Sequence, residues 1–92
     1  MRLLLAALTA CGLSMERFEE FRAEKAACVA SEVCVLAGSA QCVCPVAVNA
    51  RHAAVVESEA DRVDCGGAIV ECVQFVNPRC QDGRCVADAA TE

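Results

Sequence analysis

The spacing of apolar and polar positions changes several times along the chain, and the first pattern is helical. Between residues 14 and 28, three apolar side chains recur on one face of a helix while charged residues populate the others. Ser14 is a suitable N-cap, and Glu16 stands in the first turn, where the helix dipole favours an anion. This pattern predicts a helix over residues 14–28, with an apolar face formed by Phe18, Phe21 and Cys28.

Two short segments rich in valine follow this helix, a composition typical of strands. Residues 31–37, "SEVCVLA", end at the turn signal Gly38-Ser39. Residues 41–48, "QCVCPVAV", contain Pro45, which favours the start or the edge of a strand. We expect an extended conformation in both segments.

A helical period returns at Asn49, which is a plausible N-cap, and Gly66-Gly67 is a natural stop. The pattern predicts a second helix over residues 49–64, with charged residues off an apolar stripe made of Ala53, Val56, Ala60 and Val63.

The last third of the chain predicts extended structure that ends in a hairpin. Residues 68–76, "AIVECVQFV", have the composition of a strand, and Asn77-Pro78 is a breaker. Asp82-Gly83 then lies at the centre of a predicted type I′ turn, which is a strong short-range hairpin signal. The order of elements predicts an α+β fold: a small disulfide-rich domain of two helices with a short antiparallel sheet that includes a C-terminal hairpin.

Composition explains how so short a chain could be stable. The 92 residues contain nine cysteines, three phenylalanines, and no tryptophan or tyrosine, so small side chains must fill the core. Small side chains bury little apolar surface, and disulfides at roughly 2–4 kcal/mol each would supply the missing stability. The net charge of −5 argues against a nucleic-acid partner, because such binding requires clustered basic residues.

Nine cysteines cannot all form disulfides within one chain, so one of them must be left over. Without Cys11 the set is even, which predicts four disulfides among 105 possible pairings of Cys28, Cys34, Cys42, Cys44, Cys65, Cys72, Cys80 and Cys85. In the predicted hairpin Cys80 faces Cys85, and a bridge between them would close a very small loop. Longer loops constrain the unfolded chain more. We therefore expect these two cysteines not to pair with each other, and at least one to bond Cys28, Cys34, Cys42 or Cys44.

The first ten residues have the order of an export signal, and we treat residues 11–92 as the domain. Arg2 precedes the apolar run Leu3–Leu8, and small residues then lead to Cys11. The stretch "LTACG" resembles a bacterial lipobox, in which the cysteine thiol accepts a lipid; Gly12 is compatible with sorting to the outer membrane. Two alternatives stay open: a signal that is cleaved without lipidation, and a short helix with no targeting role.

Rival chemistries have weaker support in the sequence. The spacing of the close cysteine pairs and of His52 along the sequence is not that of a typical zinc site. The sequence also contains no C-x-x-C motif, which a thiol redox role would require. A nucleophilic pair of Cys44 with His52 would need a free thiol, which an even set does not leave. Glu57 and Asp61 are one helical turn apart, and we expect them on a solvated face. We predict no enzyme activity, no cofactor and no metal.

A resemblance adds to this interpretation. The "PVAVN" block from Pro45 to Asn49 and the closing motif "CQDGRC" are similar to motifs in small cysteine-rich proteins of myxobacteria and related bacteria that are predicted to be lipoproteins. The resemblance implies an exported, envelope-attached domain and assigns no catalytic activity.

Two functions follow as expectations. The first is a non-enzymatic lipoprotein domain, monomeric, anchored through Cys11 at the bacterial outer membrane or in the periplasm, with an unknown protein partner and a binding or structural role. The alternative is a secreted protease inhibitor that presents Arg79, within "NPRCQ", to a trypsin-like pocket.

Overall fold

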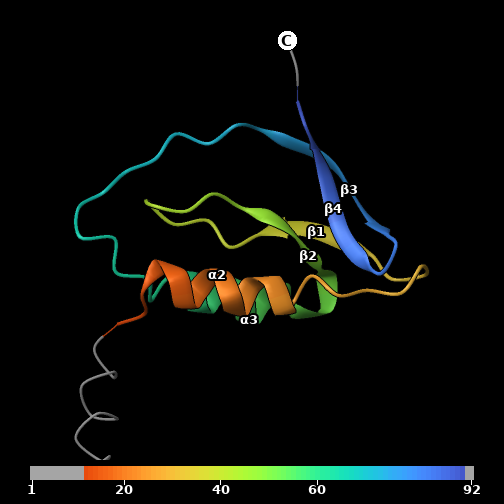
Figure 1. Cartoon of the computed structure of the whole chain (residues 1–92), viewed down its shortest axis with the longest axis horizontal. Helices are drawn as coiled ribbons and strands as arrows, with labels where there is room; N and C mark the ends of the chain where they lie inside the picture. Colours follow the sequence, from red (N-terminus) through yellow and green to blue (C-terminus); the bar gives the residue numbers. More distant parts are fainter. Residues whose placement is uncertain (1–11, 91–92) are drawn as a thin grey trace, which may run out of the picture.

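The computed structural model describes residues 12–90. Two helices lie side by side against one face of a two-stranded ladder, and a C-terminal hairpin stands at the end of that ladder (Figure 1). In chain order the elements are α2 (Met15–Glu24), β1 (Cys34–Ala37), β2 (Val46–Asn49), the 3-10 helix η2 (Ala50–His52), α3 (Ala53–Ala60), β3 (Phe75–Gln81) and β4 (Arg84–Ala89).

Helix α2 begins where the sequence predicts. The Ser14 hydroxyl accepts a hydrogen bond from the backbone N–H of Arg17 at 3.1 Å, so Ser14 is the N-cap. The helix ends at Glu24, however, four residues before the expected end at residue 28. The carbonyl of Ala26 instead accepts from the N–H of Cys85 at 2.7 Å, and the N–H of Cys28 donates to Gly83 at 3.0 Å. Bonding to the tip of the hairpin therefore replaces the last helical turn.

Strands β1 and β2 are antiparallel, in a register that pairs Cys34 with Asn49 and Ala37 with Val46. Both strands are shorter than expected and begin later than residues 31 and 41. Val48 is buried, and the main hydrophobic core gathers side chains from both helices and both strands: Phe18, Ala37, Cys42, Val43, Val48, Val56 and Ala60.

The second helical region begins as predicted at Asn49, whose side-chain oxygen accepts from the N–H of Arg51 at 3.1 Å. The buried positions Val56 and Ala60 confirm the apolar stripe. Helix α3 ends at Ala60 and not at residue 64. Beyond it, Leu13 forms an isolated bridge with Val63, which takes the chain out of the helical path.

The C-terminal region contains the predicted hairpin but differs from the sequence prediction in the strand before it. Asp82 and Gly83 have φ values of 53° and 86°, as a type I′ turn requires, so the predicted hairpin is present. Asn77-Pro78 does not break the strand but forms an irregularity inside β3, where Asn77 has a φ of 59°. The predicted strand at 68–76 is wrong over residues 68–74, which have no regular structure and cross the molecule between Cys65 and β3 (Figure 1).

The fold is a small disulfide-rich α+β domain, as predicted. Its β-structure forms two separate two-stranded ladders, β1–β2 and β3–β4, and not one continuous sheet. Within residues 12–90, neither helix has both the length and the apolar character that crossing a bilayer would require.

Candidate functional site

Four disulfides hold the elements together, with Cα separations from 5.5 to 6.0 Å, which suit such bonds. The structure uses all eight cysteines that follow Cys11, in the pairs Cys28–Cys80, Cys34–Cys85, Cys42–Cys65 and Cys44–Cys72. Cys80 and Cys85 face each other across the hairpin without bonding, as expected, and both reach back to the N-terminal half.

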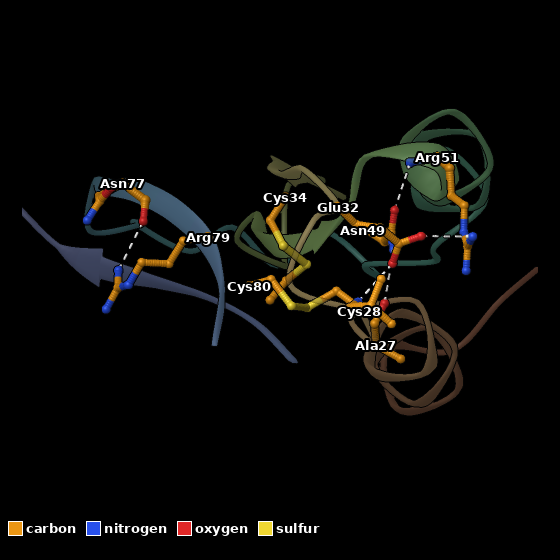
Figure 2. The surroundings of a disulfide bond; sticks show 11 residues. Ala27, Cys28, Glu32, Cys34, Asn49, Arg51, Asn77, Arg79 and Cys80 are labelled. Carbon is orange, nitrogen blue, oxygen red and sulfur yellow. Dashed lines mark hydrogen bonds and ion pairs between the residues drawn. A yellow bond between two sulfur atoms is a disulfide. The ribbon is translucent and has the colours of Figure 1, made fainter. Parts of the chain in front are cut away.

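Two of these disulfides lie next to each other near the turn of the hairpin (Figure 2). The sulfur atoms of Cys28, Cys34 and Cys85 are buried and lie within 4.8 Å of one another. Each of these sulfurs already belongs to a disulfide, so none offers a thiolate to a metal ion in this oxidised state.

A polar clamp beside these disulfides fixes the loop between α2 and β1. The Asn49 side chain is only 2% exposed, and its Nδ2 donates to the carbonyl of Ala27 at 3.1 Å and to Glu32 Oε1 at 2.8 Å. Glu32 also pairs with Arg51, whose Nη1 lies 2.9 Å from Oε2 (Figure 2). The clamp therefore joins the loop to the end of β2 and the start of η2.

The same contacts favour the ionised form of Glu32. A hydrogen bond from the backbone N–H of Val29 is the strongest influence that lowers the pKa of Glu32 below its ordinary value. The Asn49 amide and the nearby Arg51 and His52 act in the same direction, and partial desolvation opposes them.

A groove of about 460 Å³ opens between α2, β2 and the hairpin. Its walls are mainly apolar, formed by Ala23, Ala26, Val46, Ala47, Phe75, Cys85, Val86 and Ala87, and its charged residues are Glu19, Arg22 and Arg84. The disulfide of Cys85 with Cys34 fixes one wall to β1. The groove is thus pre-formed by cross-linked elements.

Arg22 is the unusual residue of this groove, because its side chain is buried and charged. It is 7% exposed, and its Nη1 donates to the carbonyls of Gly38 at 3.0 Å and Cys44 at 2.6 Å. Its guanidinium also stacks over the Phe18 ring, 5.0 Å from the centroid. Burial lowers the pKa of Arg22 from its ordinary value, and the negative charge of Glu19 acts in the opposite direction.

Sequence reasoning missed Arg22. The signal that could have found it is its position four residues after Phe18, which places both side chains on the same helical face. Charged residues on the buried face of a helix need partners, and here the partners are carbonyls of distant loops.

The predicted inhibitor residue Arg79 does not project from a loop. It lies in β3, opposite Val86, and its Nη2 is 3.2 Å from Asp88 Oδ1 on β4. Its Nη1 donates to the carbonyl of Asn77 at 3.0 Å (Figure 2). The hydrogen bond from Arg79, first, and then that from Asn77 lower the pKa of Asp88. This engaged side chain does not favour an inhibitor role.

The other candidates are also engaged. Cys44 is bonded to Cys72, so it cannot act as a nucleophile with His52, whose Nε2 accepts from Arg51 Nε at 3.4 Å. Glu57 and Asp61 are exposed, as expected, and Glu57 Oε2 also accepts a hydrogen bond from the N–H of Gly38 at 3.1 Å. Cys11, the predicted lipidation site, lies outside the described residues.

The chain matches no protein-family model, and no curated protein or solved structure is significantly similar to it.

Proposed function

We propose that the protein is an exported, non-enzymatic binding module, held at the bacterial envelope by a lipid on Cys11. Four disulfides within 92 residues support export, because cytosolic thiols are generally kept reduced. They also give a small core the stability that a cell-surface or periplasmic domain needs.

The observation that carries the proposal is the complete pairing of the later cysteines. The eight cysteines from Cys28 to Cys85 bond one another, so none of them is left for Cys11. A ninth cysteine directly after "LTA" and before Gly12 suits a thiol that accepts a lipid. The lipid would be the membrane contact, and the folded domain would remain outside the bilayer.

Binding is better supported than catalysis by what the described residues do. The groove beside α2 is an apolar concavity with a few charged groups at its margin, which is the usual form of a ligand site. The nucleophile considered from the sequence, Cys44, is consumed in a disulfide.

The test is metabolic labelling of the full chain in a Gram-negative bacterium with a clickable fatty acid, followed by membrane fractionation. We expect labelled protein in the membrane fraction, and loss of both label and attachment for Cys11→Ala. Ser14→Ala is the matched control, because it changes the nearby N-cap and leaves the thiol; it should remain labelled and attached.

Two results would contradict the proposal. Membrane attachment that survives in Cys11→Ala would show that the thiol is not the anchor. A soluble protein without lipid, cleaved near residue 10, would identify a plain export signal instead.

A further inference from the structure

The groove beside α2 has the size and lining of a site for one small apolar molecule. At roughly 30 Å³ per heavy atom, the share that a water molecule occupies, about 460 Å³ accommodates on the order of fifteen heavy atoms. Four alanines line it, and their short side chains leave the space open: Ala23, Ala26, Ala47 and Ala87.

The charges in the groove favour an anion. Arg22 and Arg84 outnumber the one carboxylate, Glu19, although the protein as a whole carries a net charge of −5. Arg84 is exposed, and its Nη2 makes one long contact, 3.3 Å, to the carbonyl of Ala23. Its guanidinium is therefore free to turn toward a ligand.

Arg22 adds a buried cation that forms no ion pair within the described residues, although the charge of Glu19 is near enough to act on its pKa. Both of its hydrogen bonds use Nη1. Every fully buried polar side-chain atom described has a partner, so Nε and Nη2 of Arg22 must still reach solvent. A buried charge is costly when it is unpaired, and an anion would supply charge-assisted hydrogen bonds.

We propose that this groove binds a medium-chain fatty acid, with its carboxylate at Arg22 and Arg84 and its alkyl chain along Val46, Phe75 and Val86. The apolar walls select the chain, and the two guanidinium groups select the carboxylate. The Cys34–Cys85 disulfide holds the wall in place before binding, which reduces the ordering cost. The proposal goes beyond the anchor at Cys11 and holds whether or not that thiol carries a lipid.

The test is titration of the purified full chain carrying Cys11→Ala, which removes any lipid of its own, with dodecanoate below its micellar concentration. Calorimetry and amide chemical shifts are the readouts. We expect saturable one-to-one binding with shifts at residues 19–26 and 84–87. Dodecanol, of equal length but uncharged, should bind about tenfold more weakly, and dodecyltrimethylammonium should bind more weakly still.

Variants separate the two parts of the site. Arg84→Gln should weaken dodecanoate about tenfold and leave dodecanol unchanged, whereas Ala87→Leu should weaken both by filling the groove. Arg17→Gln, an exposed arginine elsewhere on α2, is the matched control and should change neither. The dodecanoate affinity of Arg22→Lys is measured together with its circular dichroism spectrum, because Arg22 also donates hydrogen bonds to the backbone at Gly38 and Cys44 and its replacement could disturb the fold.

Three outcomes would overturn the proposal: equal affinity for dodecanoate and dodecanol, an unchanged affinity in Arg84→Gln, or tighter binding of an apolar peptide with a free C-terminal carboxylate. Failure here alongside successful fatty-acid labelling of Cys11 would leave the proposed function intact.

Discussion

Cys80 and Cys85 are direct partners in the register of the hairpin, yet their sulfurs bond Cys28 and Cys34 and not each other. The two bridges span 52 and 51 residues of sequence. Loops of this length restrict the unfolded chain far more than the small ring that a Cys80–Cys85 bond would close. The same bonds attach the hairpin to the rest of the domain, and the Cys34–Cys85 bond fixes the wall of the groove that contains Cys85.

The pairing can be read from a non-reducing digest. Trypsin and a cut after Leu36 should give two cross-linked species. One should join residues 26–36 to the peptides 80–84 and 85–92, and the other should join residues 37–51 to 63–79. An isolated species of 80–84 bonded only to 85–92 would show a Cys80–Cys85 bridge and contradict the structure.

Removal of the Cys28–Cys80 disulfide and removal of the Cys44–Cys72 disulfide should destabilise different parts of the protein. Replacing both Cys28 and Cys80 with alanine should lower the free energy of unfolding by about 2–4 kcal/mol, because the bridge ties the hairpin to the segment that follows α2. Replacing Cys44 and Cys72 should mainly release residues 66–74, which are exposed and irregular. Denaturant titration and hydrogen exchange measure the two effects. Equal protection of residues 66–74 in both double variants would contradict this assignment.

Gly38 should tolerate a side chain much less than Gly66, although both have positive φ values, 90° and 58°. A Cβ on Gly38 would lie 2.9 Å from Arg22 Cδ and 3.0 Å from Val56 Cγ1, whereas nothing lies within 4 Å of one on Gly66. Gly66→Ala should cost about 1–2 kcal/mol from backbone strain alone. Gly38→Ala should cost more, as measured by thermal unfolding, and equal losses would contradict the packing around Arg22.

Stability should fall in acid partly through Glu32. Its pKa in the folded protein is held below its ordinary value, about 4.3, by the contacts of the clamp. The resulting stabilisation is present above that ordinary value and is lost as the pH falls through the lowered pKa of the folded state. Glu32→Gln should therefore show a flatter loss of stability below about pH 4.3 in denaturant titrations. Glu20→Gln, an exposed α2 variant, is the control, and an unchanged profile in Glu32→Gln would contradict the role of the clamp.

Local signals determined much of the secondary structure. The Ser14 and Asn49 caps act on backbone donors two or three residues away, and the Asp82-Gly83 turn depends on the φ angles of two adjacent residues. Such interactions involve residues that are close together in the sequence. The sequence therefore predicted where both helices begin and where the hairpin turns. The even cysteine count likewise pointed to the four disulfides.

Other features of the protein depend on contacts between residues that are far apart in the sequence. Residues 68–74 have the composition of a strand, but within residues 12–90 no strand lies beside them, and a strand needs a partner for its backbone. Helix α2 ends early because Ala26 and Cys28 bond the tip of the hairpin, more than fifty residues away. The choice among 105 cysteine pairings and the burial of Arg22 depend on the same distant contacts. All of these features follow from the way in which separate elements pack against one another, and a pattern of neighbouring residues does not contain that information.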